Sequence, residues 1–375
     1  MVVGPTLPLI GGISTYIDGL LKSKLSTKFN FICFSTNHSA NTYVPCSDNY
    51  AVIFRISLSY LLKCTATAIY HIFKFPTVVF KNKPDIIHIH TSGYLTFFEN
   101  IFYILISKIL NKKVILHIHS GDFDTFYRNS SFLVKNIIKY ILYLPDQILC
   151  LSSNLKMIFV DEIGLKINIS VMYNGYDSSL FYPKDLKKCR KLLNLPYDKF
   201  IILTVGNLLE VKGHKYLIEA VSEVILSRQN ILCIIVGDGI LKEKLDTQIK
   251  SAGLENHVKL VGGKPHGTIP LWMNASNLFV LSSLNEGNPI VMLESIGVGL
   301  PFIGTKVGAI PEIIYSEDYG LLVNPDDSKD LAKKISTAMD KKWDKRKIID
   351  YSDNFSWDNI AEHLQKLYMS LILLS

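Results

Sequence analysis

The sequence predicts an α/β protein built from two doubly wound domains, each a parallel sheet covered by helices. Short β-branched runs alternate with longer amphipathic runs along the chain, which is typical of this class. The 375 residues suffice for two domains. Hydrophobic residues make up 48% and charged residues 19% of the chain, a composition that excludes a disordered protein.

The first half carries strand-like runs after a short opening strand at residues 1–3. We expect these strands at Phe29–Ser35, Ile86–His90, Lys113–His119, Ile148–Ser152 and Ile169–Tyr173. Together they define a first domain over residues 1–182. Each run contains Ile, and two of them also contain Val, as expected of strands buried on both faces.

A second series of strand-like runs defines a second domain over residues 183–355. We expect its strands at Phe200–Val205, Leu232–Val236, Val258–Val261, Asn277–Leu281 and Pro301–Thr305. The charged stretch Phe181–Tyr197 is predicted to connect the domains. The final stretch, residues 356–375, has the apolar spacing of a helix.

The net charge of +7 comes almost entirely from the first domain, where 16 Lys and Arg face 10 Asp and Glu. This balance suits a membrane surface or an acidic ligand better than a nucleic-acid groove. We find neither a membrane-spanning segment nor a signal peptide. The cysteines are widely spaced, and Cys33, Cys150 and Cys233 are expected in the core, which predicts a cytoplasmic protein.

The strongest functional signal is a pair of glutamates, Glu286 and Glu294, around the predicted start of a helix. Pro289 suits the first helical position. The two carboxylates would lie about 8–10 Å apart, a span that fits a nucleotide sugar with free N–H groups between them for phosphate. The alternative is two solvated acids at a helix start, where acids are common.

Glycine-containing loops follow several predicted strands of the second domain. Gly206 and Asn207 follow its first strand, with Lys212 a few residues later as a cation suited to a diphosphate. Gly237 follows the next strand, and residues 308–312 form another loop-to-helix junction. Open α/β sheets bind ligands at this edge. The alternative is a set of ordinary βα turns with an exposed lysine.

The order of these motifs resembles the family 4 glycosyltransferases. The second half shows G-N-L-L-E-V-K-G, V-G-D-G, E-G-N-P with L-E, and V-G-A-I-P-E. The first half adds G-G-I-S, D-I-I-H-I-H and L-H-I-H-S-G. The resemblance implies two Rossmann-like domains facing a central cleft (GT-B). It also implies that the helix at residues 356–375 packs back on the first domain.

The resemblance also implies roles for individual residues. Glu286 would hold donor-sugar hydroxyls, Glu294 the ribose, and Lys212 the departing diphosphate. His119 would lie near the reacting sugar, with His117 as a competing candidate on the same strand face. The catalytic set is therefore His119, Glu286 and Lys212. The remaining substrate-binding residues are Gly11, Gly12, Gly206, Asn207, Gly237, Gly262, Gly287, Asn288, Pro289, Ile290 and Glu294.

Two positions depart from the family pattern. Asn207 stands where the family commonly has arginine, so Lys212 would carry more of the diphosphate charge. Three consequences stay open: weaker donor binding, a compensating cation elsewhere, or a subgroup that manages with lysine. Ser120 replaces the usual glycine after the histidine, a minor change.

The resemblance implies a retaining transfer that depends on stabilisation of the leaving group. We expect no cofactor and no required metal, with a UDP-linked donor preferred over a GDP-linked one. Asp122 and Asp124 match the D-x-D pattern of a metal-binding motif. They follow His119 in the first domain, so we interpret the match as a coincidence. A hydrolase-type pair of carboxylates straddling the scissile bond fits poorly.

The expected partners are a nucleotide-sugar donor and a saccharide or lipid-linked acceptor, as in surface polysaccharide or glycolipid synthesis. Basic, aromatic stretches at Ile53–Lys83, Phe97–Lys113 and Phe126–Leu144 suggest peripheral docking on the inner face of the plasma membrane. Ordinary sheet-covering helices are the alternative. Two other functions stay open: a catalytically silent scaffold of this fold, and a Rossmann oxidoreductase, which lacks a G-x-G-x-x-G motif.

Overall fold

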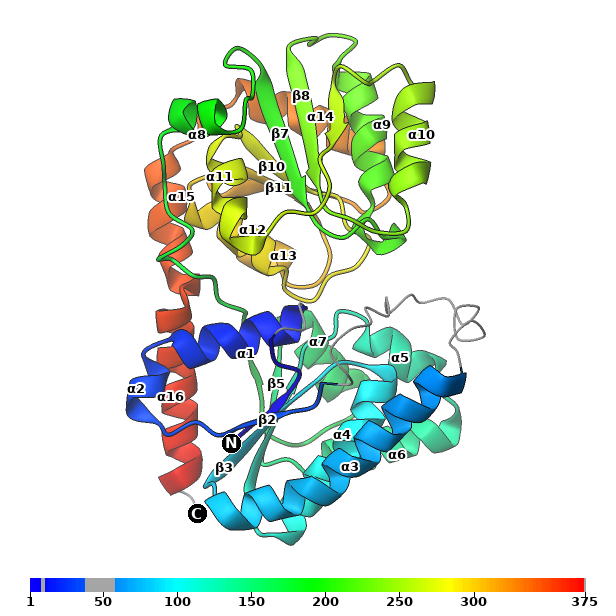
Figure 1. The fold of residues 1–375 in the computed structure, drawn as a ribbon, viewed down its shortest axis with the longest axis vertical. Coiled ribbons are helices and arrows are strands. Elements are labelled where there is room, and N and C mark those ends of the chain that lie inside the picture. The colour runs from blue at the N-terminus through cyan, green and yellow to red at the C-terminus, as the bar shows by residue number, and fades with distance from the viewer. Residues whose placement is uncertain (8–10, 38–57, 374–375) are drawn as a thin grey trace. The chain divides into compact units, whose positions relative to one another are not determined.

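The computed structural model describes residues 1–7, 11–37 and 58–373, which form two compact units (Figure 1). The first unit contains residues 1–151, 155–172 and 361–375, and the second contains 152–154 and 173–360. Each unit is a parallel six-stranded sheet with helices packed on it, which confirms the predicted fold class.

The first sheet has the strand order β2-β1-β3-β4-β5-β6. Its strands are β1 (Val2–Gly4), β2 (Cys33–Ser35), β3 (Ile86–Thr91), β4 (Lys113–Ile118), β5 (Gln147–Cys150) and β6 (Ile169–Val171). The helices of this unit are α1 (Gly12–Lys22), α2 (Leu25–Lys28), α3 (Leu58–Asn82), α4 (Tyr94–Ile109), α5 (Phe123–Asn129), α6 (Phe132–Leu142), the end of α7 (Ser153–Met157) with the π-turn Ile158–Glu162, and most of α16 (Trp357–Leu373).

The second sheet has the order β12-β11-β10-β7-β8-β9. Its strands are β7 (Phe200–Val205), β8 (Ile231–Val236), β9 (Val258–Leu260), β10 (Leu278–Leu281), β11 (Phe302–Thr305) and β12 (Gly320–Val323). Its helices are α8 (Leu186–Leu192), α9 (His214–Val224), α10 (Lys242–Ser251), α11 (Ile269–Asn274), α12 (Ile290–Gly297), α13 (Ile310–Ile313), α14 (Ser328–Asp340) and α15 (Lys345–Ser352). Short 3₁₀ turns cover Glu210–Lys212, His266–Thr268 and Asp353–Phe355.

The stretch predicted to connect the domains belongs instead to the second unit. Residues 186–192 form α8, and Arg190 of this helix is buried. Its guanidinium donates to the carbonyls of Ala275, Pro196, Tyr197 and Lys199 and to the Asn277 side chain. A stretch with the composition of a charged linker is therefore fixed by one buried cation, and each of the three guanidinium nitrogens of Arg190 has an acceptor.

The chain passes between the units earlier than the predicted boundary after residue 182. Residues 173–182 pack with the second unit because Tyr176 and Phe181 belong to its core. The return passage comes after Ile360, so most of α16 belongs to the first unit.

Two further expectations need correction. Cys33 is exposed, because β2 is an edge strand whose alternation turns Phe34 inward and Cys33 outward. The edge strand β12 was not predicted, since Gly320–Val323 is too short to form a recognisable run. Within the described residues, no helix is long and apolar enough to cross a membrane.

Candidate functional site

The strand order of the second sheet places its ligand edge between β7 and β10. β7 pairs with β8 on one side and with β10 on the other, so the chain reverses direction across the sheet at this point. Crevices at such switch points, beyond the carboxyl ends of the strands, are the usual ligand sites of open α/β sheets. The loops after β7 and β10 contain Gly206 and Glu286, so topology alone brings these predicted residues to one edge.

Three predicted glycines line the carboxyl ends of β7, β8 and β9. The Gly206 amide donates to the Val236 carbonyl over 3.0 Å, and the Gly237 amide donates to the Gly262 carbonyl over 3.2 Å. A Cβ atom on Gly237 would lie 1.9 Å from the Gly206 carbonyl oxygen, so only glycine allows this close approach. The glycines thus leave a row of bare backbone at the ligand edge.

Lys212 and Glu286 form an ion pair at this edge. Lys212 Nζ donates to Glu286 Oε1 over 2.7 Å, and Ser283 Oγ donates to the same oxygen over 2.8 Å. The lysine and glutamate side chains are 25% and 10% exposed. Lys212 stands in the 3₁₀ turn before α9 and Glu286 in the loop after β10, so the pair joins the two sides of the switch point.

The segment between the two glutamates leads into α12. The Gly287 carbonyl accepts from the Ala309 amide over 2.8 Å, and the Asn288 carbonyl accepts from Asn174 Nδ2 over 2.6 Å. Pro289 is the N-cap rather than the predicted first helical residue, and α12 begins at Ile290. No side chain of the described residues caps this helix, which leaves its first amides for another acceptor.

The side chain of Asn288 is buried, and its amide oxygen and nitrogen have no hydrogen-bond partner among the described residues. Such groups are rare in native proteins and call for an explanation. Asn288 lies between Glu286 and the start of α12, where the sequence predicted donor binding.

Glu294 is buried in the second turn of α12 and contacts a histidine that the sequence analysis did not single out. His266 Nε2 lies 2.6 Å from Glu294 Oε1, and the glutamate side chain is only 5% exposed. His266 comes from the 3₁₀ turn before α11. It stands alone in an uncharged stretch of the sequence, so no local motif signals its contact with a carboxylate 28 positions later.

Asn207 is exposed at the carboxyl end of β7. Its carbonyl lies 3.2 Å from Nε2 of His214, the first residue of α9. Burial lowers the pKa of His214 to about 4, so the ring is neutral at pH 7. His214 therefore supports the loop through an uncharged contact, and Lys212 is the cation that this loop places beside Glu286.

The first unit carries the predicted histidine. His119 follows β4, and its Nε2 lies 2.9 Å from Nδ1 of His90 on β3. Burial lowers the pKa of His119 to about 3, which keeps the ring neutral at pH 7. His117, the competing candidate, is fully buried, whereas His119 is partly exposed. Of the two, His119 is the one that a substrate could reach.

Gly11 and Gly12 begin α1 of the first unit. Gly11 is the N-cap, and its carbonyl accepts from the Thr15 amide and from Ser14 Oγ. A Cβ atom on Gly12 would meet nothing within 4 Å. Both glycines are exposed, so this helix start is accessible to a ligand.

Other acids at these strand ends have local partners. Asp122 accepts a hydrogen bond from Ser120 Oγ, and Asp124 lies 3.2 Å from Arg128. In the second unit, Glu312 accepts from the amides of Ser153 and Asn154 and from the Tyr173 hydroxyl. Glu312 thus stabilises the segments where the chain enters this unit.

Both halves of the chain match glycosyltransferase family models. Residues 10–180 match the model described as Glycosyltransferase Family 4, and residues 187–355 match the one described as Glycosyl transferases group 1. With the two sheets and the site residues above, these matches show that the chain belongs to the family 4 glycosyltransferases of GT-B fold.

Relatives and solved structures agree with this assignment. The chain is 26% identical over 382 residues to an uncharacterized glycosyltransferase of Methanocaldococcus jannaschii, with 97% of this chain and 96% of that protein covered. It is 30% identical over 204 residues to an Escherichia coli UDP-Gal:alpha-D-GlcNAc-diphosphoundecaprenol alpha-1,3-galactosyltransferase, with 52% of each protein covered. For several other curated relatives the match also spans only about half of the relative's length.

Among solved structures, the Anabaena protein HepE in complex with UDP has the same fold. Its TM-score is 0.76 at 18% identity, covering 98% of this chain and 99% of that one. A sucrose-phosphate synthase from Thermosynechococcus elongatus gives a TM-score of 0.75 at 19% identity, covering 100% and 99%.

Proposed function

We propose that this glycosyltransferase moves a sugar from a nucleoside-diphosphate sugar to an acceptor hydroxyl with retention of configuration. The observation that carries the proposal is the Lys212–Glu286 ion pair beside the glycine row and the uncapped start of α12. One cation, one carboxylate and free backbone amides at a sheet edge are the groups that a diphosphate and a sugar require. A fold neighbour's complex with UDP supports a nucleotide donor.

In this proposal the ion pair opens when the donor binds. Lys212 Nζ moves from Glu286 to the diphosphate and stabilises the charge that grows as the bond from sugar C1 to phosphate oxygen breaks. The acceptor oxygen bonds to C1 on the face that the diphosphate leaves, and a departing phosphate oxygen accepts the hydroxyl proton. Glu286 accepts from donor-sugar hydroxyls, and the amides of Asn288 and Ile290 assist it.

Glu294 is proposed to accept from the ribose hydroxyls of the donor. His266 orients the carboxylate, because its contact with Oε1 fixes the side chain inside a buried position. In the first unit, His119 is the proposed catalytic histidine, and Gly11 and Gly12 are proposed to contact the donor. None of these roles uses a metal or a cofactor, and UDP is the proposed nucleotide of the donor.

Calorimetric titration of the purified protein with UDP, GDP, ADP and NAD, in EDTA, tests the proposal. We expect saturable binding of UDP, and we expect Lys212→Ala to abolish it. Exposed Lys187 of α8 provides a matched control, Lys187→Ala, which should bind as wild type. Binding of NAD alone would indicate an oxidoreductase instead. Binding of no nucleotide would indicate a silent scaffold.

Turnover provides the second test. Glu286→Gln keeps the size of the side chain and removes its charge, so we expect a folded protein whose donor turnover falls by about 10²–10³-fold. Donor consumption can be followed by release of the nucleoside diphosphate. An unchanged rate in the folded variant would remove Glu286 from the mechanism.

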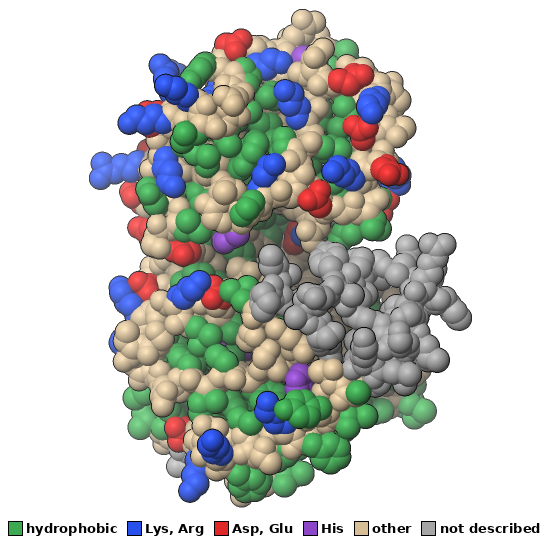
Figure 2. Space-filling model, in the orientation of Figure 1, with side chains coloured by type: hydrophobic (Ala, Val, Ile, Leu, Met, Phe, Trp, Pro, Cys, Tyr) green, Lys and Arg blue, Asp and Glu red, His purple; other side chains and the backbone are tan. Residues whose placement is uncertain are grey.

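We further propose that the first unit docks on a membrane that carries a lipid-linked acceptor. Large apolar side chains are exposed on α6, including Phe132, Leu133, Ile137 and Tyr140. Lys135 and Lys139 stand on the same helix. Figure 2 shows hydrophobic side chains at the surface of the first unit. Apolar residues beside lysines are suited to the headgroup region of an anionic bilayer.

Of the basic residues predicted for such docking, Arg55 lies outside the described residues, and Lys63 stands in α3 where side chains are not described. Sedimentation with vesicles containing phosphatidylglycerol tests the proposal. We expect co-sedimentation of the wild type and its loss in a Phe132→Asp and Leu133→Asp double variant. Leu226→Asp, at an 84% exposed leucine of the second unit, is the matched control. Equal sedimentation of both variants would contradict the proposal.

A further inference from the structure

Four histidines gather inside the first unit on two adjacent strands. His88 and His90 lie on one face of β3, because alternate residues of a strand share a face, and His117 and His119 do the same at β4. His90 pairs with His117 in the sheet register. The ring centroids of His88 and His90 are 4.2 Å apart, and those of His117 and His119 are 4.1 Å apart.

Three of these rings carry buried nitrogens that make no hydrogen bond to the described residues. They are Nε2 of His88, Nε2 of His90, and both ring nitrogens of His117. The three side chains are at most 1% exposed. Four unsatisfied nitrogens in one place are unusual, since buried polar groups are nearly always paired. The glycosyl transfer proposed above assigns them no task.

The nitrogens are close enough for one ion to satisfy them together. One ligand nitrogen of each of His88, His90 and His117 lies within 4.8 Å of those of the other two. In a tetrahedral site with metal–nitrogen bonds of about 2.0–2.1 Å, ligand nitrogens stand about 3.4 Å apart. The rings of His88 and His117 are stacked with 8° between their planes, so ion binding requires these rings to turn until their nitrogen lone pairs converge.

The second nitrogen of two of these rings already has a partner. His88 Nδ1 lies 2.7 Å from the Tyr368 hydroxyl, and His90 Nδ1 lies 2.9 Å from His119 Nε2. When each Nδ1–H donates to its partner, Nε2 of the same ring presents its lone pair to the cluster. Metal-binding histidines usually have an outer partner of this kind, which fixes the tautomer and the ring orientation.

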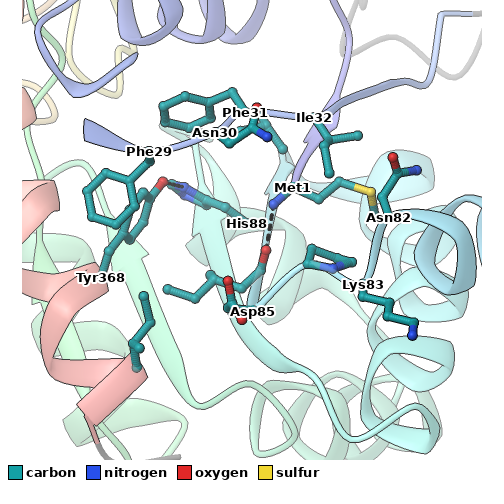
Figure 3. Close-up of a pocket in the computed structure, with 14 residues that line it drawn as sticks. Met1, Phe29, Asn30, Phe31, Ile32, Asn82, Lys83, Asp85, His88 and Tyr368 are labelled. Carbon is teal, nitrogen blue, oxygen red and sulfur yellow. Dashed lines mark hydrogen bonds between the residues drawn. The ribbon is translucent and has the colours of Figure 1, made fainter. Parts of the chain in front are cut away.

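A pocket leads to one side of the cluster. It has a volume of about 200 Å³ and is lined by His88 and Tyr368 together with Met1, Phe29 and Asp85. In Figure 3 the His88 ring points toward the Tyr368 hydroxyl at this pocket. This pocket reaches the Tyr368 side of the His88 ring, and His90 and His117 do not line it.

We propose that His88, His90 and His117 bind one transition-metal ion, with Zn²⁺ as the ion best suited to three neutral imidazoles. The ion joins β3 to β4 and, through the His90 contact, sets the orientation of the His119 ring. The site is structural and lies entirely in the first unit, whereas the proposed diphosphate and ribose contacts of Lys212 and Glu294 lie in the second.

Titration of the EDTA-treated, dialysed full-length chain with ZnCl₂ tests the site. We expect one Zn²⁺ per chain and a rise in the thermal midpoint of unfolding. His117→Gln should abolish this binding, and Tyr368→Phe, which removes only the outer hydroxyl, should weaken it about 10–100-fold. The matched control is His363→Gln, at an exposed histidine, which should bind as wild type.

X-ray absorption at the zinc edge of the loaded wild type decides the proposal even where a variant fails to fold. We expect at least three nitrogen ligands at about 2.0 Å with the scattering pattern of imidazole. Absence of a one-to-one complex, undiminished binding by folded His117→Gln, or a spectrum dominated by oxygen or sulfur would each overturn the proposal. Nucleotide binding by the second unit can hold or fail independently of these results.

Discussion

The asparagine at position 207 adds no positive charge to the loop after β7, which is proposed to bind a diphosphate. The side chain is exposed at the carboxyl end of the strand, and Lys212 of the same loop is already paired with Glu286. Asparagine can donate a hydrogen bond but brings no charge. The predicted consequence of this departure from the family pattern is weak donor binding that depends mainly on Lys212.

Restoring the arginine tests this consequence. We expect Asn207→Arg to tighten UDP binding about tenfold, since charge-assisted hydrogen bonds to phosphate are about twice as strong as neutral ones. This gain in UDP affinity should decrease as salt is added, because salt screens exposed charges. Calorimetry at two salt concentrations measures both effects. Gln229→Arg adds the same charge at the opposite end of the sheet, just before β8, and should leave affinity unchanged.

His214 makes the stability of the second unit depend on pH. Its pKa in the folded protein is about 4, below the ordinary value of 6.5, because burial disfavours the charged ring. The stabilising contribution is therefore fully present above about pH 6.5 and is lost as the pH falls through about 4. The loss amounts to about 3 kcal/mol when complete.

We expect His214→Gln to flatten the fall in thermal midpoint between pH 6.5 and pH 4, since glutamine does not titrate there. Differential scanning calorimetry across this pH range measures the effect. The control His363→Gln, at an exposed histidine, should follow the wild-type curve. Parallel curves for His214→Gln and wild type would contradict the assignment.

At the scale of elements, most strands were predictable because parallel strands buried on both faces form continuous apolar runs. The run Phe200–Val205 is identical in sequence prediction and structure. Phe29–Ser35 was too long, because only Cys33–Ser35 pairs with β1. The strand β12 and the helix α8 were missed. The edge strand β12 is too short to appear as a run of apolar residues in the sequence. The helix α8 is held by one buried arginine, so its sequence looks polar and charged.

The candidate site was predictable where a local motif carries it. The structure brings Glu286 and Lys212 together, as expected for loops that follow parallel strands and meet at one edge, while the roles of these residues and of Glu294 stay predictions. His266 and Ser283 were not found, since their contacts with the glutamates come from tertiary packing that no spacing reveals. The histidine cluster of the first unit was not predicted, for a similar reason. Alternation showed which residues share a strand face, but the burial of their nitrogens depends on the packing of α1 and α16.

The turn that carries Lys212 into α9 requires glycine at position 213. Gly213 has φ +62°, and a Cβ atom there would lie 2.0 Å from the Ser282 carbonyl oxygen. We expect Gly213→Ala to destabilise the second unit by several kcal/mol, because both the backbone and the contact are unfavourable. Gly253 has φ +65° with open space around its Cβ position, so Gly253→Ala should cost only about 1 kcal/mol. Urea unfolding of both variants gives the comparison.

At the scale of the whole molecule, the two units have separate hydrophobic cores. Proteins of this kind can unfold in more than one transition. The proposed diphosphate and ribose contacts belong to the second unit, so we expect UDP at 100 times its dissociation constant to stabilise chiefly that unit, by about 2.7 kcal/mol. Scanning calorimetry with and without UDP should show one transition moving more than the other. Equal shifts would mean that both units bind the nucleotide with similar energy.

The chain order of the two units has a consequence for synthesis on the ribosome. The second unit is built almost entirely from one continuous stretch, whereas the first also needs residues from 361 onward, including the Tyr368 that contacts His88. At about 5–20 residues per second, residues 173–360 take roughly 10–40 s to emerge. The first unit thus lacks most of α16 while the second is made, and His88 is without its Tyr368 contact during that interval.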